Sequence, residues 1–206
     1  KCEMAKWFEI KVRAKLGGDE SDDREVTILG RSVRWTEAGI EWEADPKHRQ
    51  RIMNYFGFGD NTKALQVNGD KSKSVETEWD NELLDKKGST EFRGLAATVN
   101  FLSQDWANLQ FPTKEVTKEM ANPRNGSWIK MKKLARYISG CKRIVWRFDW
   151  QEEATEATVL TDSDWGGTSR DRKSTSGGAW MIGGHFIQTW SASQGAYALS
   201  SAEAEL

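Results

Sequence analysis

The sequence has little of what marks disulfide-rich, metal-binding or membrane-spanning chains. It holds two cysteines, Cys2 and Cys141, and two histidines, His48 and His185, each far from the others. This spacing matches no zinc pattern and no disulfide framework, so free thiols in a reducing compartment are expected. No apolar run approaches the ~20 residues that a membrane-spanning helix needs, and no membrane partner is expected.

The chain also lacks an excess of charge of either sign. Lys and Arg number 30 against 31 Asp and Glu, which leaves a formal net charge of -1. Overall charge therefore identifies no partner. The isolated histidines allow no Ser-His-Asp or Cys-His catalytic set, and no glycine-rich phosphate loop is present. Tryptophan is abundant instead, with 11 residues that we interpret as core and stacking anchors.

The first sixty residues combine strand and helix patterns. Residues 2–18 predict a helix that ends at a pair of glycines. Residues 26–35 and 39–44 predict two strands joined by a short turn. Asp45 then precedes a proline and a helical pattern that runs to Gly57, which predicts an N-cap followed by a first helical turn.

The middle of the chain changes from a polar stretch to helices. Residues 60–90 are polar, lack clean periodicity and are interpreted as a linker. Residues 91–140 predict three helices, the last of which is expected to start at the N-cap Ser127 and to end at Gly140. One face of that last helix is apolar and the other is basic.

The basic residues are concentrated in one segment. Residues 124–147 contain eight Lys or Arg and no Asp or Glu. Two interpretations stay open, a solvated helix face or a surface that contacts nucleic-acid phosphates. In the second, the interleaved Trp128, Tyr137 and Trp146 would serve for packing or base stacking. The candidate nucleic-acid-binding residues are Lys130, Lys132, Lys133, Arg136, Lys142 and Arg143.

From residue 157 onward the pattern predicts strands. Residues 157–165 suit a strand that ends at carboxylates, and residues 179–193 suit a hairpin that turns at two glycines. A short strand over 196–200 and a helix follow, with Ser200 and Glu203 spaced as a capping box. Antiparallel strands followed by a helix predict a mixed α/β arrangement rather than a parallel nucleotide-binding sheet.

Four acids lie where a strand ends or the last helix starts: Asp162, Asp164, Glu203 and Glu205. Two-metal phosphodiester hydrolysis needs several carboxylates that converge from different elements, because cations must neutralise their clustered charge. Glu203 has a competing role as the capping partner, so Glu205 is the better ligand candidate. The alternative explanation is that all four acids are surface residues and caps.

One stretch carries a specific resemblance to a known family. The ordered blocks TDSDWGG, RDRKSTSGG, a Gly-Gly turn, TWSAS and ALSSAEAEL closely resemble the ribonuclease H region of copia-type (Ty1/copia) retrotransposon Pol polyproteins. Upstream, ILGRSVRWTEAGIEWEADPKHRQRIMNYFGF resembles the end of the reverse transcriptase, where the thumb begins. The chain starts at Lys1 and stops at Leu206 inside a helical pattern, so a fragment of such a polyprotein is expected.

The resemblance implies a division of the chain into four parts. Residues 1–59 would be the end of the reverse transcriptase palm and thumb, and residues 60–90 would be a linker. Residues 91–150 would be a helical connection to the ribonuclease H-like domain. Residues 157–206 would form the first three antiparallel strands and first helix of a ribonuclease H-like domain, incomplete here. The implied fold class is α+β, a β-hairpin plus helices followed by this truncated sheet.

The resemblance also implies a site and its partners. Asp162 matches the family's first metal-binding aspartate and Glu205 matches its helix glutamate, whereas Asp164 matches a motif residue. The two acids would bind Mg²⁺, with two ions in the complete domain, and would serve the hydrolysis of RNA in RNA–DNA hybrids. The partners would be the hybrid, template RNA and DNA, and the remainder of the polyprotein. The implied location is intracellular, first a cytoplasmic particle and then the nucleus, and the fragment alone is expected to be inactive.

Two alternatives stay open beside this enzyme fragment. The segment 124–147 could belong to a non-catalytic nucleic-acid-binding module. The chain could instead be a decayed copy without activity, because DWANLQF stands where the family usually has Asp-Arg-Pro-Asp before an apolar pair. In that interpretation Trp106, Ala107 and Asn108 are products of drift.

Overall fold

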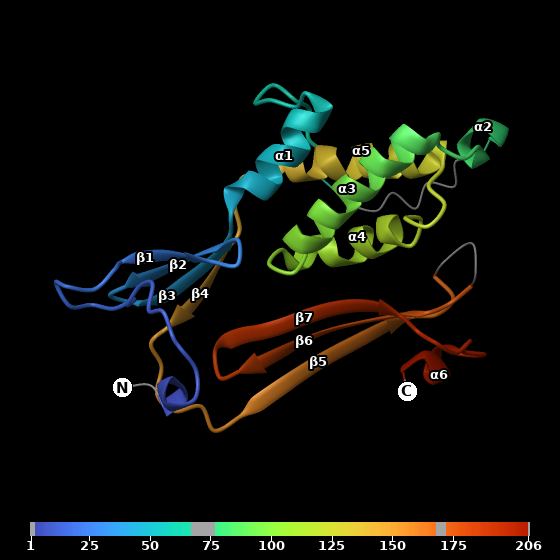
Figure 1. The fold of residues 1–206 in the computed structure, drawn as a ribbon. Coiled ribbons are helices and arrows are strands. Elements are labelled where there is room, and N and C mark those ends of the chain that lie inside the picture. Colours follow the sequence, from blue (N-terminus) through green and yellow to red (C-terminus); the bar gives the residue numbers. More distant parts are fainter. Residues whose placement is uncertain (1–2, 67–76, 168–171, 206) are drawn as a thin grey trace.

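The computed structural model describes residues 3–66, 77–167 and 172–205, which form a group of helices with two attached antiparallel sheets (Figure 1). The helices are α1 (Pro46–Phe56), α2 (Glu78–Asn81), α3 (Lys86–Leu102), α4 (Gln110–Thr117), α5 (Asn125–Gly140) and α6 (Ser201–Glu205). The strands are β1 (Glu25–Ile28), β2 (Arg31–Thr36), β3 (Gly39–Ala44), β4 (Val145–Asp149), β5 (Ala157–Asp164), β6 (Thr175–Ile182) and β7 (His185–Ser193). An α+β fold with antiparallel sheets is thereby confirmed.

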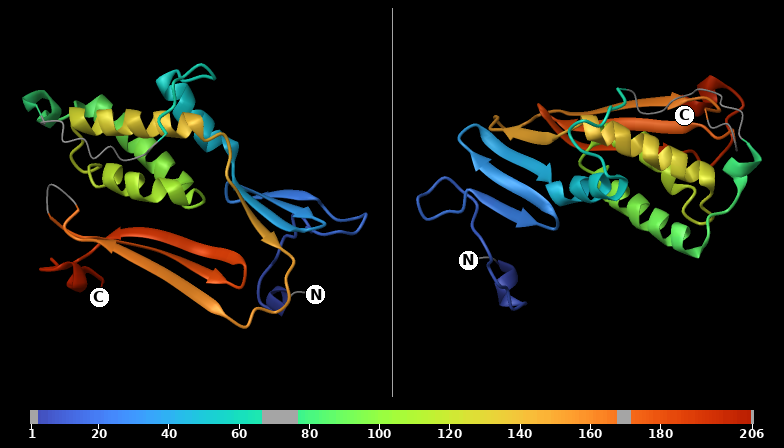
Figure 2. Two further views of the ribbon diagram at one scale, coloured as in Figure 1. Left: turned by 180° about the vertical axis from the view of Figure 1, so that it is seen from behind. Right: turned by 90° about the horizontal axis from the view of Figure 1, so that it is seen from above.

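We call α1, α3, α4 and α5 together the helical unit. Figure 2 shows from two further directions that the two sheets extend from this unit in different directions. Among the described residues, no helix has both the length and the apolar character needed to cross a membrane.

The N-terminal sheet has four strands in the order β1-β2-β3-β4, and each neighbouring pair is antiparallel. The stretch predicted as one strand over 26–35 is divided, because Leu29 and Gly30 have φ angles of 49° and 74° and reverse the chain. The prediction missed β4, which lies in the segment interpreted as helical and pairs with β3 from far along the sequence. The turn before Gly39 is confirmed, and a Cβ at Gly39 would lie 2.1 Å from Phe148 O of β4.

The two faces of this sheet differ in character. The strand register places Val33, Trp42 and Trp146 side by side on one face. The neighbouring positions Arg34 and Glu41 lie on the other face, where their side chains approach to 3.8 Å. Alternation of apolar and charged residues along each strand therefore gives one face that packs and one face that carries ion pairs.

The helix boundaries follow the predicted caps in α1 and depart from them in α5. Asp45 Oδ1 accepts a hydrogen bond at 3.0 Å from the backbone two residues later, and Gly57 has a φ of 64°. In contrast, α5 begins at Asn125, before the predicted N-cap Ser127. Ser127 Oγ accepts from Arg124 N at 2.8 Å, so this hydroxyl still caps the helix start, but from inside the first turn.

The stretch 60–90 contains more regular structure than a linker does. It includes α2 and the first turn of α3, and Thr77 Oγ1 caps α2 by accepting from Asp80 N at 3.3 Å. Asp85 caps α3 by accepting from Gly88 N at 2.7 Å. Residues 67–76 of the predicted linker lie outside the described residues.

The helix predicted over 2–18 is wrong. Only Glu3–Lys6 forms a single 3-10 turn, and residues 9–15 have no regular structure. Phe8 and Val12 are 66% and 78% exposed, so no apolar face of this segment is packed. A short helix is marginal in water without such packing, and from Phe8 to Leu16 every second residue is apolar and every residue between is charged, which is the period of a strand rather than of a helix.

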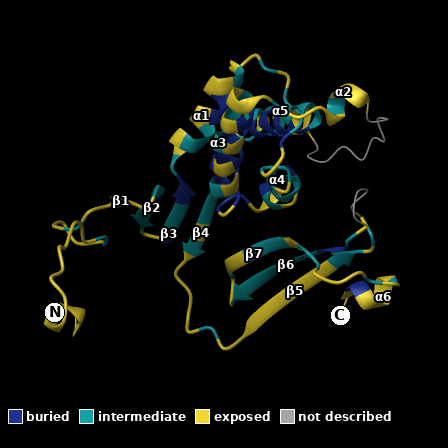
Figure 3. Ribbon diagram, turned by 45° about the vertical axis from the view of Figure 1, so that its right-hand side comes forward, coloured by how far each residue is buried: buried dark blue, intermediate teal, exposed yellow. Residues whose placement is uncertain are grey.

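The hydrophobic core lies in the helical unit, where Figure 3 shows most of the buried residues. Its fully buried side chains include Ile52, Phe92, Val99, Leu102, Leu109, Met131, Leu134 and Ile138. No described residue of β5, β6 or β7 belongs to this core cluster, and Val159 and Leu160 are more than half exposed. The helical unit is therefore the scaffold on which the C-terminal sheet is held.

The C-terminal sheet has the order β5-β6-β7 with antiparallel neighbours, and α6 follows it. The three predicted strands are thus confirmed, although β6 starts at Thr175, earlier than the predicted 179. The short strand predicted over 196–200 is wrong, since these residues form only bends and irregular backbone. The hairpin turns at Gly183, whose φ is 56°, as the glycine pair predicted.

Gly178 in β6 is expected to tolerate no side chain. An added Cβ would lie 2.2 Å from Trp190 Cζ2 and 2.7 Å from Leu160 O, because the indole ring covers this position. We expect Gly178→Ala to lower the free energy of unfolding by roughly 1–3 kcal/mol, as overpacking does. The matched control is Gly177→Ala, where the nearest atom would be 3.7 Å away. Urea unfolding measures both, and equal losses in the two variants would contradict the expectation.

Candidate functional site

The two strand-end aspartates have different surroundings. Asp164 Oδ1 accepts a hydrogen bond of 2.5 Å from Thr175 N on β6. Its carboxylate also occupies the space beside Gly167, where a Cβ would lie 2.0 Å from Asp164 Oδ2. Asp162 is exposed and forms no hydrogen bond or ion pair with any described residue. Asp164 therefore shapes the end of the strand, while Asp162 offers an unengaged carboxylate.

The two helix glutamates divide in the same way. Ser200 Oγ accepts from Glu203 N at 3.2 Å, and Glu203 Oε2 accepts from Leu199 N at 2.7 Å. This is the predicted capping box displaced by one residue, because the glutamate binds the amide before the N-cap. Glu205 is exposed and has no polar partner in the described part of the chain.

Gln194 attaches α6 to the sheet. Its Nε2 donates to Ala204 O at 2.5 Å and to Ser176 Oγ at 2.9 Å, and Ala204 is buried. The last helix also lies beside β5, the strand that carries Asp162. Within the described ranges, however, no group of three or more His, Cys, Asp or Glu side chains is placed to hold a metal ion. The acids among the described residues do not by themselves fit a two-ion site.

The predicted nucleic-acid-binding residues separate into engaged and unengaged cations. Lys132 and Lys142 are exposed and have no ion pair in the described residues, whereas Lys133 is exposed but is not among the unengaged cations. Lys130 forms an ion pair with Glu119. The two remaining cations are Arg136, which donates to Lys63 O at 3.0 Å, and Arg143, which donates to Glu43 at 2.7 Å. Among the described residues, the unengaged part of the basic segment is thus smaller than its composition indicates.

Glu43 of β3 explains why Arg143 is engaged. Its carboxylate is buried and accepts from Arg143 Nε at 2.7 Å and from Arg34 at 2.9 Å. Burial acts to raise the pKa of Glu43, but the hydrogen bonds from the two guanidinium groups outweigh it, so this pKa lies below its ordinary value. Arg143 therefore connects the end of α5 to the four-stranded sheet, and its side chain remains half exposed.

Asp105 is a buried junction that the sequence analysis did not single out. Its carboxylate accepts from Arg31 Nε at 2.9 Å through both oxygens and from Trp42 Nε1 at 2.8 Å. Its backbone carbonyl accepts from Trp146 Nε1 at 2.5 Å. Asp105, a single residue in the loop after α3, thus contacts β2, β3 and β4. A local signal was lacking, because none of these partners is near Asp105 in the sequence.

The residues next to Asp105 are also integrated in the structure. Trp106 is 3% exposed and belongs to the hydrophobic core, and Asn108 Nδ2 donates to Tyr137 OH at 2.8 Å. These are two of the residues that the decayed-copy interpretation treats as drift. Their packing and hydrogen bonding show that this segment has a defined structural role in the fold.

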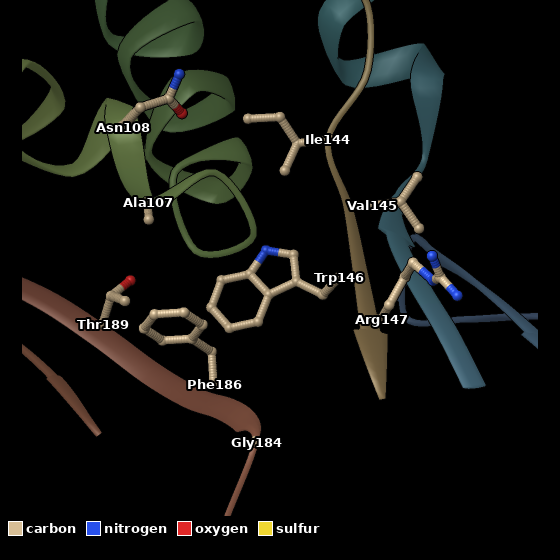
Figure 4. A pocket seen from close by; sticks show the side chains of 9 residues that line it. All are labelled: Ala107, Asn108, Ile144, Val145, Trp146, Arg147, Gly184, Phe186 and Thr189. Atoms are coloured by element: carbon tan, nitrogen blue, oxygen red, sulfur yellow. The ribbon is translucent and has the colours of Figure 1, made fainter. Parts of the chain in front are cut away.

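A pocket of about 540 Å³ lies between the helical unit and the two sheets (Figure 4). Trp146 of β4 and Phe186 of β7 meet edge to face in it, with ring centroids 6.2 Å apart. The side chain of Arg147 points away from it. The residues that line it are Ala107, Asn108, Ile144, Val145, Trp146, Arg147, Gly184, Phe186 and Thr189. No acid or histidine lies among them, so this pocket holds no groups for acid–base or metal chemistry.

Comparison with known proteins agrees with the resemblance drawn from the motifs. The chain is similar to a retrovirus-related Pol polyprotein from transposon RE2 of Arabidopsis thaliana, with 28% identity over 116 residues. The match covers 56% of this chain and 8% of that polyprotein, so the chain spans a small part of its relative's length. No family model matches the chain, and no solved structure matches it. The resemblance to a copia-type retrotransposon Pol polyprotein is thus confirmed.

Proposed function

We propose that this chain is a nucleic-acid-contacting segment of a retrotransposon Pol polyprotein. In this proposal, the four-stranded sheet and the helical unit form the C-terminal end of the reverse transcriptase and connect it to the next domain. The C-terminal sheet and α6 begin a ribonuclease H domain. The parent protein would copy element RNA into DNA and hydrolyse the RNA strand of the resulting hybrid, inside an intracellular particle and then in the nucleus.

One observation carries the ribonuclease H part of the proposal. The antiparallel strands β5, β6 and β7 lead into α6, and the acids on β5 and α6 that lack structural partners are Asp162 and Glu205. These are the two positions that match the family's catalytic acids. The neighbouring acids Asp164 and Glu203 are occupied by backbone hydrogen bonds, which supports the same assignment.

The metal requirement is not met by this chain's described acids. Two carboxylates are fewer than a pair of Mg²⁺ ions needs, since such ions take several oxygen ligands. Asp162 and Glu205 would therefore be part of a ligand set that other segments of the polyprotein complete. Hybrid binding, in contrast, needs only cations and shape, and it is the function that can be tested on this chain directly.

The expected result is salt-sensitive binding of an RNA–DNA hybrid through the exposed lysines of the basic segment. The logarithm of the association constant should fall linearly with the logarithm of salt concentration, and the slope should be about −0.9 for each phosphate contact. Replacing Lys132, Lys133 and Lys142 together by Gln should weaken binding at low salt and reduce that slope. Fluorescence anisotropy with a labelled hybrid, over a series of NaCl concentrations, gives both quantities.

The matched control changes the same number of charges elsewhere. Lys11, Lys86 and Lys87 are exposed and lie outside the basic segment, and their triple Gln variant should retain the wild-type slope. Circular dichroism on each protein shows that folding is kept. If both triple variants reduce the slope equally, only net charge matters and the basic segment is a solvated helix face. If the wild type does not bind the hybrid at all, the proposal fails.

A non-catalytic nucleic-acid-binding module is the second candidate function. The observation in its favour is that the described residues contain no group of three or more metal-ligating side chains. Both candidates expect hybrid binding, but only the first expects that longer Pol chains cleave RNA with the help of Asp162 and Glu205. The decayed-copy alternative stays open, because the integration of Trp106 and Asn108 into the fold supports only that this segment folds, and cleavage by longer Pol chains would distinguish the two.

A further inference from the structure

Helix α4 holds the C-terminal sheet through two polar side chains that are one helical turn apart. Gln110 Nε2 donates to Thr189 O at 2.9 Å and to Thr189 Oγ1 at 2.8 Å. Lys114 Nζ donates to Thr175 Oγ1 at 2.6 Å. Residues four apart lie on the same helix face, so both side chains reach β6 and β7 together. In Figure 1, α4 accordingly lies along the sheet.

Lys114 is held in an enclosed position. Its side chain is 11% exposed, and Glu115 Oε1 lies 3.3 Å from its ammonium group. Burial lowers the pKa of Lys114, while the charges of Glu115 and Asp164 act against this lowering. An enclosed ammonium group needs well-placed acceptors, because its desolvation is otherwise unfavourable. The contact with Thr175 is thus one of the few that keep this side chain in place.

The contact continues from Thr175 to the acid-bearing strand. While Thr175 Oγ1 accepts from Lys114, its backbone N–H donates to Asp164 Oδ1 at 2.5 Å. Asp164 ends β5, two positions after Asp162. A single residue of β6 therefore connects the helical unit to the end of the strand on which the candidate catalytic acid lies.

Other contacts between this sheet and the rest of the molecule lie near the opposite end of its strands. His185 Nε2 lies 2.8 Å from Asp149 O, and Phe186 packs on Trp146, both next to the hairpin turn of β6 and β7. No described residue of β5, β6 or β7 belongs to the hydrophobic core of the helices. Polar contacts from α4 are therefore expected to decide how firmly the acid-bearing end is held.

We propose that Lys114 is a positioning residue that fixes the acid-bearing end of the C-terminal sheet on the helical unit, through Thr175 and Asp164. The consequence of this attachment for catalysis rests on the proposed function, since the attached strand carries Asp162. The attachment itself does not depend on the proposed function, because it exists without nucleic acid. Lys114 touches no reacting group and acts only through its neighbours.

Amide hydrogen exchange tests the proposal residue by residue on the whole chain without nucleic acid. Lys114→Met keeps the length of the side chain and removes its ammonium group. The amides of Thr175 and Gly166, which bond Asp164 and Ser174, should then exchange roughly tenfold faster, as expected for loss of a charge-assisted hydrogen bond. The core amides of α3 should keep their rates, and Lys114→Arg should restore most of the protection.

Two further variants make the test specific. Lys118→Met removes the lysine at the C-cap of α4, which pairs with Glu115 and forms no hydrogen bond or ion pair with the described residues of the sheet, so it should leave the Thr175 amide unchanged. Thr175→Val removes the acceptor, and the double variant with Lys114→Met should exchange no faster than either single variant. Additive effects would mean that the two side chains act separately, and the proposal would fail.

The possible outcomes separate this inference from the proposed function. Unchanged exchange at Thr175 in Lys114→Met would overturn it, and so would an equal acceleration in α3, which indicates a loss of global stability only. Hybrid binding is measured on the same proteins by anisotropy. If Lys114→Met accelerates exchange locally but the wild type binds no hybrid, the attachment is supported and the proposed function is rejected. If the wild type binds the hybrid but exchange at Thr175 is unchanged, the attachment is rejected and the proposed function is retained.

Discussion

Asp105→Ala is expected to lower the free energy of unfolding by about 3–5 kcal/mol, the usual loss when one partner of a buried ion pair is removed. The carboxylate is 6% exposed and accepts hydrogen bonds from Arg31 and from Trp42. Without it, a largely buried guanidinium group and an indole N–H lose their acceptor. Domains of this kind are stable by only about 5–15 kcal/mol, so the variant should lose much of its stability. Chemical denaturation followed by circular dichroism measures the loss.

Two comparisons show whether burial is the cause. Asp149→Ala breaks an ion pair with Arg147 in which both side chains are about 60% exposed, and such pairs contribute little. Its midpoint should stay close to that of the wild type. The double variant Arg31→Met with Asp105→Ala should recover part of the loss, because no unpaired buried charge remains. Similar midpoints for Asp105→Ala and Asp149→Ala would show that Asp105 does not join the sheet to the helices.

The second large effect concerns hydrolysis in a longer Pol chain that contains this segment. Asp162→Asn or Glu205→Gln should reduce cleavage of the RNA strand of a hybrid to background while leaving the stability of the fold unchanged. Cleavage should be lost because the two acids are the proposed metal ligands. Stability should be unchanged because neither carboxylate has a partner in the described residues, so no folding contact is removed. The 206-residue chain by itself is expected to cleave no RNA, because the two candidate carboxylates are fewer ligands than a pair of Mg²⁺ ions needs.

Asp164→Asn and Glu203→Gln are the matched comparisons, because each changes an acid within two residues of a candidate catalytic acid. Asp164 accepts from Thr175 N and Glu203 accepts from Leu199 N, so these variants should lower stability while retaining much of the cleavage. Gel assays of a labelled hybrid and thermal unfolding of the same proteins separate the two effects. An inactive but stably folded Asp164→Asn beside an active Asp162→Asn would show that the assignment is displaced by two residues.

Local signals in the sequence were sufficient wherever a short stretch carries its own boundary. Asp45 and Gly57 placed α1 correctly, since a side-chain N-cap and a left-handed glycine act on neighbouring backbone groups. The C-terminal strands, the hairpin turn at Gly183 and the helix start near Ser200 followed in the same way. Local rules failed at Leu29–Gly30, where the turn contains none of the usual Asn-Gly or Asp-Gly pairs.

The candidate acids were also found from the sequence, through motifs that match a family. Composition and spacing alone favoured Glu205 over the capping partner Glu203, but they did not separate Asp162 from Asp164, and all four acids could still be surface residues or caps. The structure separates them by their hydrogen bonds, since two of the four carboxylates are used by backbone amides. It also divides the basic segment, because Lys130 and Arg143 pair with acids that are distant in the sequence.

What the sequence by itself determined is the set of local elements, their caps and the residues that resemble a known site. Only the tertiary structure decided that β4 completes the first sheet, that Asp105 joins this sheet to the helices, and that Lys114 reaches Thr175. Each of these contacts links residues more than fifty positions apart. The pairing of such residues depends on how the helices pack. It therefore cannot be predicted from the periodicity or the capping residues of the segments that contain the two partners.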